Sequence, residues 1–183
     1  ADETPISWFN YTYDSRGRLS TFTQGTGSNS RTATFAYDSN GYLATITDPL
    51  GQITSFAYDA AGRINAQTLP DGRVIGYAYD ANSNLTALTP PGRTAHNFAY
   101  TLVDLMSAYT PPSLGGGTTS TTYAYNLDRQ LISATRPDGQ AVTIGYDSAG
   151  RQNALTTPRG TTSYAYSAST GNLATVNAPG GIG

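Results

Sequence analysis

Short stretches of the chain alternate between aromatic or aliphatic residues and small or polar ones. In the stretch TSFAYDAAGR (54–63), Phe56 and Tyr58 are two residues apart, so an extended strand places them on one face. The same spacing joins Phe35 to Tyr37 and Tyr77 to Tyr79. Read in the same way, two further segments predict shared faces for Leu43, Thr45 and Thr47 and for Leu85, Ala87 and Thr89. The alternation predicts half-buried β-strands.

Two kinds of turn signal separate these strands. In Asp59-Ala60-Ala61-Gly62, Asp stands first and Gly fourth, which is typical of a type I turn closed by a left-handed glycine. In Leu69-Pro70-Asp71-Gly72, proline presets φ at the second position and glycine again takes the fourth. Segments 48–51, 136–139 and 157–160 repeat the second signal. The chain is therefore predicted to alternate strand, Asp-x-x-Gly turn, strand and x-Pro-x-Gly turn.

The strands and turns form a repeat. Counting from Tyr37, Gly41 follows at +4, Pro49 at +12 and the next repeat tyrosine, Tyr58, at +21. Copies of the pattern begin near Tyr13, Tyr37, Tyr58, Tyr79, Tyr100, Tyr125, Tyr146 and Tyr166. We predict a single array of eight copies over residues 1–183. Insertions interrupt the spacing at GTGSNS (25–30) and SLGGGTTSTT (113–122), which predict longer surface loops.

The repeat predicts an all-β fold with about 16 antiparallel strands. A single hairpin is not stable in water, so stacked hairpins are expected to form a curved or spiralling β-hairpin solenoid with almost no helix. In this interpretation each repeat tyrosine packs between strands and each aspartate fastens a turn. The structural signature consists of Tyr13, Asp14, Gly17, Tyr37, Asp38, Gly41, Tyr58, Asp59, Gly62, Tyr79, Asp80, Tyr146, Asp147 and Gly150.

The amino-acid composition also favours strands, and it excludes several classes of partner and binding site. The chain has 14 Tyr and 20 Gly but no Lys and one Glu, which favours strands and turns over helices. Its net charge is −2 and no basic stripe is present, so nucleic acid is not an expected partner. No apolar run is long enough for a membrane-spanning helix. The absence of cysteine excludes disulfides and thiolate metal sites and is compatible with an exported bacterial protein.

The motif Tyr-Asp-x-x-Gly-Arg-Leu followed by x-Pro-x-Gly resembles the YD repeat, also called the Rhs repeat. Residues 13–19 match the motif in full, and residues 58–64 and 146–151 match it closely. The resemblance covers nearly the whole chain. This family includes bacterial Rhs polymorphic toxins, the BC components of Tc toxins, wall-associated proteins and animal teneurins.

The resemblance implies large β-sheet shells wound from hairpins, which in the toxins enclose a C-terminal toxin domain. In other members the repeats act in adhesion and contact carbohydrate. The Rhs core that closes such shells, with its autoproteolytic aspartate pair, is not recognisable here. The sequence Asp48-Pro49-Leu50-Gly51 resembles part of it but stands in an ordinary turn position. We therefore expect a wall segment of a longer, extracellular or secreted protein of bacterial origin.

The sequence offers few residues for catalysis or ligand binding. His96 is the only histidine, and its place before Phe98 and Tyr100 indicates a surface strand residue. The recurring aspartates lack the short glycine-rich spacing of calcium-binding repeats, so no metal or other cofactor is expected. Most of the aspartates stand at turn positions, where they are expected to fasten the turn. A pair of catalytic carboxylates is therefore not indicated, and the chain is not expected to be an enzyme. Trp8 suits a sugar-stacking platform, an edge contact or a place in the core of the preceding repeat. The sequons at Asn10 and Asn84 apply only to a eukaryotic secreted protein.

Two functions follow from these observations. The first is a non-catalytic structural scaffold, a wall segment of a YD-repeat shell whose partners are the remainder of its own longer chain and a C-terminal toxin. The alternative is an extracellular adhesion module that binds glycans through its Tyr-, Thr- and Asn-rich surface, at sites the sequence does not identify. Open strand edges additionally predict self-association.

Overall fold

The chain is all-β. The computed structural model describes residues 7–26, 28–113, 115 and 120–180, and within these ranges it contains β-strands and no helix. The strands are β1 Ser7–Tyr13, β2 Leu19–Thr26, β3 Asn29–Tyr37, β4 Leu43–Thr47, β5 Ile53–Tyr58, β6 Ile64–Thr68, β7 Val74–Tyr79, β8 Leu85–Thr89, β9 His96–Tyr100, β10 Met106–Thr110, β11 Thr121–Tyr125, β12 Leu131–Thr135, β13 Ala141–Tyr146, β14 Gln152–Thr157, β15 Gly160–Tyr166 and β16 Leu173–Asn177. The predicted fold class and strand number are confirmed.

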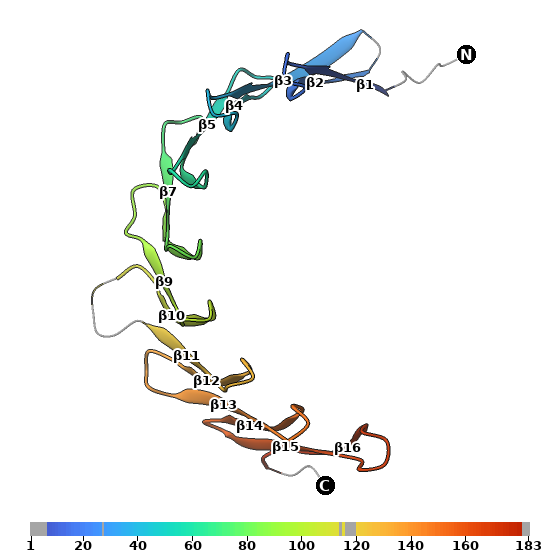
Figure 1. The fold of residues 1–183 in the computed structure, drawn as a ribbon, viewed down its shortest axis with the longest axis vertical. Helices are drawn as coiled ribbons and strands as arrows, with labels where there is room; N and C mark the ends of the chain where they lie inside the picture. The colour runs from blue at the N-terminus through green and yellow to red at the C-terminus, as the bar shows by residue number, and fades with distance from the viewer. Residues whose placement is uncertain (1–6, 27, 114, 116–119, 181–183) are drawn as a thin grey trace. The chain divides into compact units, whose positions relative to one another are not determined.

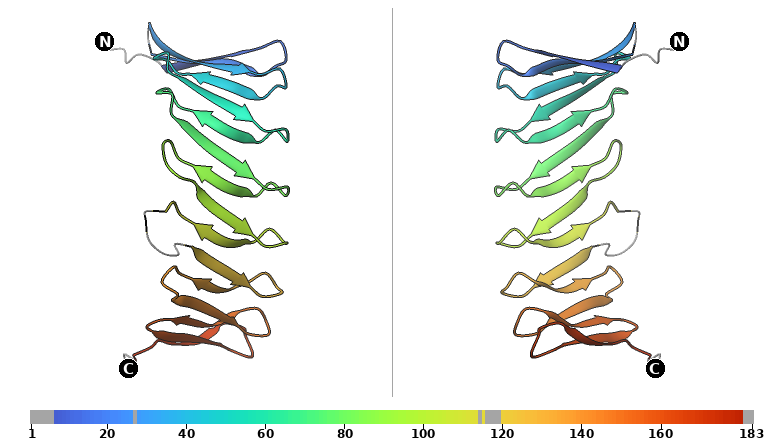
Figure 2. Two further views of the ribbon diagram at one scale, coloured as in Figure 1. Left: turned by 90° about the vertical axis from the view of Figure 1, so that its left-hand side faces the viewer. Right: turned by 90° about the vertical axis from the view of Figure 1, so that its right-hand side faces the viewer.

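Each strand pairs with its neighbours in sequence. The sheet has 16 strands in the order β1 to β16, and the paired strands are antiparallel (Figure 1). Two compact units make up the chain, Ala1–Ala78 with Leu88–Arg93 and Tyr79–Ala87 with Thr94–Gly183. Within each unit the strands follow one another as a meander, with Asp-x-x-Gly turns at one edge and proline turns or longer connections at the other (Figure 2).

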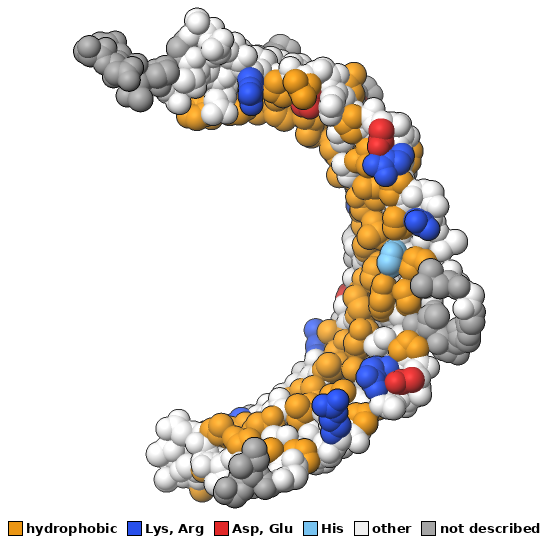
Figure 3. Space-filling view, turned by 180° about the vertical axis from the view of Figure 1, so that it is seen from behind, with side chains coloured by type: hydrophobic (Ala, Val, Ile, Leu, Met, Phe, Trp, Pro, Cys, Tyr) orange, Lys and Arg blue, Asp and Glu red, His pale blue; other side chains and the backbone are white. Residues whose placement is uncertain are grey.

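Each unit is a single layer of strands without a closed core. Among the described residues, no apolar side chain is fully buried. Most strand residues are half-buried, because their cover comes from neighbouring strands and not from a second layer. In each unit, apolar side chains gather on one face, where Figure 3 shows them in orange.

Cross-strand pairing separates an apolar face from a polar one. Phe35 lies opposite Ile46 of the next strand, and Ile46 lies opposite Thr54. On the other face the corresponding row is Ala36, Thr45 and Ser55. The second unit repeats this division. Its apolar rows include Phe98–Tyr109–Thr121, Tyr123–Ala134–Val142 and Ile144–Leu155–Thr162, and its polar rows include Ala124–Ser133–Thr143 and Ala154–Ser163.

A β-bulge corrects one prediction. Tyr37 lies opposite Leu43, but Ala36 lies opposite Thr45, so one extra residue stands between the two pairs. Leu43 therefore shares the apolar face with Tyr37, while Thr45 and Thr47 lie on the polar face. The prediction that Leu43, Thr45 and Thr47 share one face is wrong for this reason. The same register shift occurs at Tyr58, Tyr125, Tyr146 and Tyr166.

The first predicted loop is also wrong. Most of GTGSNS continues the two strands, since β2 runs to Thr26 and β3 begins at Asn29. Gly25 pairs with Ser30 and Thr26 with Asn29, so four of the six residues of GTGSNS belong to the two strands, and residue 27 lies outside the described residues. In the second predicted loop, β11 begins at Thr121, and residues 114 and 116–119 lie outside the described residues.

Candidate functional site

The Asp-x-x-Gly turns share one hydrogen-bonding pattern. The Gly62 N–H donates to the Asp59 carbonyl at 3.0 Å, and the Asp59 N–H donates to the Arg63 carbonyl at 2.9 Å. The Asp59 carboxylate accepts the N–H groups of Ala61 at 2.9 Å and Arg63 at 3.0 Å. Gly62 has φ +78°, a conformation that favours glycine because it lacks a Cβ. The aspartate thus fastens the turn, and Asp14, Asp38, Asp80 and Asp147 accept backbone N–H groups in the same way.

The proline segments also form turns. The Gly72 N–H donates to the Leu69 carbonyl at 2.9 Å, and Gly72 has φ +81°. In the segment that resembles the DPxG sequence of the Rhs core, the Gly51 N–H donates to the Asp48 carbonyl at 3.0 Å. The Asp48 carboxylate accepts the Leu50 N–H at 2.8 Å. The prediction that this segment is an ordinary turn is confirmed.

Repeat tyrosines fasten each hairpin to the one before it. The Tyr58 hydroxyl donates to the backbone carbonyl of Leu43 at 2.8 Å. Leu43 is the residue at which the β-bulge interrupts the ladder, so the tyrosine supplies a partner to a carbonyl beside the bulge. Burial and the nearby negative charge of Asp38 raise the pKa of Tyr58 above its ordinary value. The equivalent bonds join Tyr37 to Leu19, Tyr100 to Leu85, Tyr125 to Met106, Tyr146 to Leu131 and Tyr166 to Gln152.

A second contact between hairpins comes from the residue five after the repeat tyrosine, which we call the latch position. Arg18 stands there in the first hairpin, and its Nη2 lies 2.7 Å from Oδ2 of Asp14. The same guanidinium lies 4.2 Å from the ring centroid of Tyr37 in the next hairpin. Arg151 repeats the arrangement with Asp147 at 2.7 Å and the Tyr166 ring at 4.3 Å.

Other residue types make the same kind of link. At the latch position the Tyr42 ring stacks on Tyr58 with centroids 4.8 Å apart. Gln130 donates to the Gly150 carbonyl at 2.8 Å, and Asn84 donates to the Asp104 carboxylate at 2.7 Å. The structural signature predicted from the sequence omitted this position. The recurrence of Arg after the turn glycine in residues 13–19, 58–64 and 146–151 is the signal that could have identified it.

Three turn aspartates that pair with an arginine, Asp14, Asp59 and Asp147, have a lowered pKa. Hydrogen bonds from the Arg63 side chain and the Arg63 N–H lower the pKa of Asp59, and Arg151 lowers that of Asp147 in the same way. Backbone and side-chain hydrogen bonds from Arg18 lower the pKa of Asp14. A carboxylate held ionised by an arginine suits a structural ion pair better than a proton donor near neutral pH.

The individual candidates for chemistry occupy structural positions. Nδ1 of His96 lies 2.8 Å from the Tyr109 hydroxyl, and the two rings are stacked. Trp8 packs directly over Gly25, where a Cβ would meet its ring at 2.1 Å. Trp8 is 40% exposed on β1, so the edge contact is observed and a sugar-stacking role stays a prediction. Across the described ranges, no group of three His, Asp or Glu side chains is arranged to hold a metal ion.

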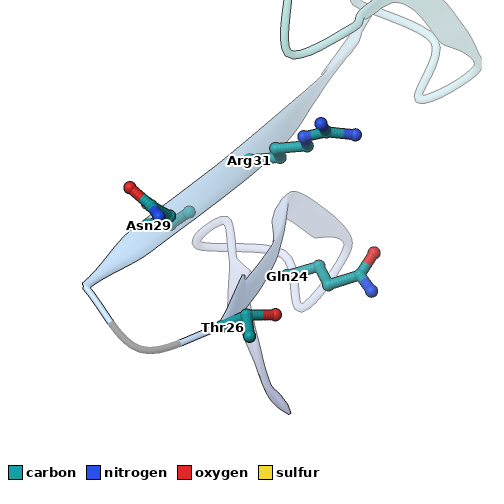
Figure 4. Close-up of a pocket in the computed structure, with 5 residues that line it drawn as sticks. Gln24, Thr26, Asn29 and Arg31 are labelled. Carbon is teal, nitrogen blue, oxygen red and sulfur yellow. The ribbon is translucent and has the colours of Figure 1, made fainter. Parts of the chain in front are cut away.

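The pockets that the described residues form are open to solvent. One of about 320 Å³ lies on the extended β2–β3 hairpin and is lined by Gln24, Thr26, Asn29, Ser30 and Arg31 (Figure 4). Arg31 is its one ionisable side chain, so it lacks an acid–base pair. Two others, lined partly by Pro70 and Pro158, lie between successive proline turns. No described helix has the length and apolar character needed to cross a membrane.

A meander of hairpins, tied together by repeat tyrosines and latch residues, defines a YD-repeat sheet. The chain belongs to the Teneurin YD-shell family, which it matches over residues 2–179. The resemblance indicated by the Tyr-Asp motif is thereby confirmed.

Solved structures with a similar fold come from Tc toxin complexes. A crystal structure of TcdB2-TccC3-Cdc42 is 16% identical to this chain, with a TM-score of 0.50. The matched region covers 93% of this chain and 12% of the chain in that crystal structure. A crystal structure of TcdB2-TccC3 without its hypervariable C-terminal region gives the same four values. A Photorhabdus luminescens Tc holotoxin pore with a substitution in TccC3 is 17% identical, with a TM-score of 0.50 and coverages of 93% and 12%.

The likeness to these structures concerns the fold. The chain spans about 12% of the length of each of these three solved chains. None of the curated proteins compared with the chain matches it.

Proposed function

We propose that this chain is a non-catalytic wall segment of a secreted bacterial YD-repeat shell, within a longer polypeptide that also carries a toxin domain. The apolar face of the sheet lies toward the enclosed passenger. The segment covers the enclosed passenger, and its own side chains do not make or break bonds in a reaction.

The uncovered apolar face is the observation that carries this proposal. Its rows contain aromatic and aliphatic residues such as Phe35, Ile46 and Phe56, yet no second layer covers them among the described residues. Contiguous exposed apolar surface marks an interaction site in a soluble protein. An unfolded passenger exposes apolar side chains that the face can contact without requiring one fixed partner shape.

The polar face supports the same assignment. Thr, Ser, Ala and Gly make up most of its rows, as in Ala57–Ala66–Gly76, while Ile53 and Val74 lie on it where β5 and β7 begin. Threonine hydroxyls also pair across strands on this face, with Thr12 and Thr21 at 2.7 Å and Thr23 and Thr32 at 2.8 Å. Such a surface is suited to face water, so the two faces of the sheet have different roles.

The mass of the native polypeptide tests the first part of the proposal. We expect a much longer chain with more Tyr-Asp repeats, a segment that closes the shell and an unrelated C-terminal domain. Sequencing of its two terminal peptides identifies these parts. A native chain of about the present size would refute the shell segment, because eight hairpins form too little wall to enclose a passenger.

Binding to an unfolded polypeptide tests the role of the apolar face. The probe is a fluorescently labelled, reduced and carboxymethylated polypeptide that stays unfolded in buffer, followed by fluorescence anisotropy. Ile75→Thr and Ile144→Thr place hydroxyls on the apolar face and should weaken binding several-fold. Thr45→Ser and Thr143→Ser on the polar face are the matched controls and should leave it unchanged. Equal losses in both sets would contradict the proposed orientation.

A further inference from the structure

Two tyrosine rings from successive hairpins are in contact at one junction of the first unit. Tyr42 directly precedes β4, and Tyr58 is the last residue of β5. Their ring centroids are 4.8 Å apart and the ring planes differ by 25°, which is a stacked arrangement. The junction therefore holds two phenol side chains against each other.

This latch position differs in its chemistry from those that carry arginine. In the first hairpin Arg18 pairs with Asp14 and lies over the ring of Tyr37, 4.2 Å from its centroid. Tyr42 replaces the arginine in the second hairpin, so Tyr58 meets a second phenol in place of a cation. Two phenols in contact can be joined by one-electron oxidation, whereas a phenol and a guanidinium cannot.

Tyr42 is both accessible and held in place. It is 40% exposed, so an oxidant in solution can reach it. Its hydroxyl end lies over the next turn, where a Cβ on Gly62 would be 2.3 Å from the hydroxyl oxygen. Tyr58 is half-buried, and its hydroxyl donates to the Leu43 carbonyl at 2.8 Å. Oxidation therefore begins at Tyr42, and Tyr58 can pass an electron to the Tyr42 radical across the stacked rings.

We propose that Tyr42 and Tyr58 form an oxidative cross-linking site, at which hydrogen peroxide and a haem peroxidase join the two rings by a carbon–carbon bond. Each phenol loses one electron and its hydroxyl proton, and the two radicals bond at ring carbons next to the oxygens. The hydrogens on these two carbons then move to the oxygens, which restores both phenols. One hydrogen peroxide takes up the two electrons and two protons and becomes two waters. This inference does not depend on the proposed shell function.

The folded junction favours coupling within one chain, because groups held in contact react far faster than the same groups meeting in solution. The bond closes a covalent loop over residues 42–58 and joins two successive hairpins. The chain has no cysteine, so no disulfide can form such a link. A cross-link that closes a loop restricts the unfolded chain, and the linked junction is therefore more stable.

Peptide mapping after oxidation tests the proposal. The purified chain is treated with a haem peroxidase and limiting hydrogen peroxide, then digested with a protease that cleaves before aspartate. The digest contains residues 38–47 and 48–58, each with one tyrosine, Tyr42 and Tyr58. Mass spectrometry detects the two peptides joined with the loss of two hydrogens. We expect this linked pair to be about tenfold more abundant than any other tyrosine-linked pair, because the two rings are already in contact.

Tyr42→Phe keeps the ring and removes the phenol, so the linked pair should disappear. Tyr109→Phe is the matched control, because the Tyr109 ring stacks on Phe98 and His96, and its replacement should leave the yield unchanged. Oxidation should raise the urea midpoint of the unchanged chain and leave that of Tyr42→Phe where it was. Far-UV circular dichroism of each variant verifies that the sheet is retained.

Three results would overturn the proposal. A linked pair no more abundant than other tyrosine pairs would show that the contact does not direct coupling. An equal yield in concentrated urea would show that the reaction needs no folded junction. When the chain is oxidised as a mixture with its ¹⁵N-labelled form, a link within one chain joins peptides of the same isotope. Equal numbers of mixed-isotope pairs would place the reaction between chains.

Discussion

Removing one repeat hydroxyl should weaken the junction between two hairpins by a predictable amount. In Tyr58→Phe the ring is kept, along with its stacking on Tyr42 at 4.8 Å, and only the 2.8 Å bond to the Leu43 carbonyl is lost. A neutral hydrogen bond contributes about 0.5–1.5 kcal/mol net to stability. Because the site is half-buried and water can reach the freed carbonyl, we expect a loss of about 1 kcal/mol, below the roughly 3 kcal/mol of a fully buried orphan.

Tyr13→Phe is the matched control. Tyr13 holds the same place in its hairpin, but it is 62% exposed on the edge strand, so its replacement should change the free energy of unfolding of the dilute chain by less than about 0.3 kcal/mol. Urea denaturation followed by circular dichroism measures both variants, and amide hydrogen exchange in β4 and β5 locates the effect. Equal losses in the two variants, or none at Tyr58, would refute the role assigned to the hydroxyl.

The pKa of Tyr58 gives the same prediction a second readout. Its pKa is raised in the folded chain by burial and by the charge of Asp38, so the unfolded chain loses this proton first as pH rises. Stability from this residue is complete below the ordinary tyrosine pKa and is lost as pH rises through the raised value. The alkaline fall in stability should therefore be less steep in Tyr58→Phe. An unchanged alkaline profile would contradict the raised pKa.

Three further predictions concern the turns. The lowered pKa of Asp59 gives stability that is complete above the ordinary carboxyl pKa and is lost as pH falls through the lowered value, so Asp59→Asn should flatten the acid limb of stability against pH. Gly62→Ala should lower the free energy of unfolding more than Gly72→Ala. Both glycines have positive φ, but only at Gly62 would a Cβ meet the Tyr42 side chain, at 2.3 Å. In urea denaturation we expect a loss of about 1–2 kcal/mol at Gly72 and a larger loss at Gly62. Arg129 has φ +63° at a turn position where other repeats have glycine, so Arg129→Gly should raise the free energy of unfolding by about 1 kcal/mol, and a loss would contradict the strain.

The sequence predicted the strands and turns because each depends on residues close together in the chain. Period-two alternation around Tyr58, aspartate at the first turn position and glycine at the fourth are local signals, and the structure has them where they were expected. The fold class followed from their repetition. The family resemblance rested on the same residues.

What the sequence did not predict depends on pairing between strands. The bulge after Leu43 moves Thr45 and Thr47 to the polar face, and no residue type in that segment marks the extra position. GTGSNS has loop composition, yet Gly25 pairs with Ser30 and Thr26 with Asn29 across β2 and β3. Trp8 covers Gly25. The latch position was missed because arginine, tyrosine, asparagine and glutamine all fill it. Its role is defined by what it reaches in the next hairpin and not by one residue type.

The absence of a buried core among the described residues explains why these junction contacts matter so much. A two-stranded hairpin is marginal in water, and here no second layer covers it. Each hairpin therefore takes its stability from its neighbours, through the cross-strand rows, the tyrosine hydroxyls and the latch residues, and the total grows with each junction added. Within the array every junction satisfies the same groups. Loss of one junction contact, such as the Tyr58 hydroxyl bond to the Leu43 carbonyl, is therefore expected to weaken the pairing of two hairpins without a buried core to compensate.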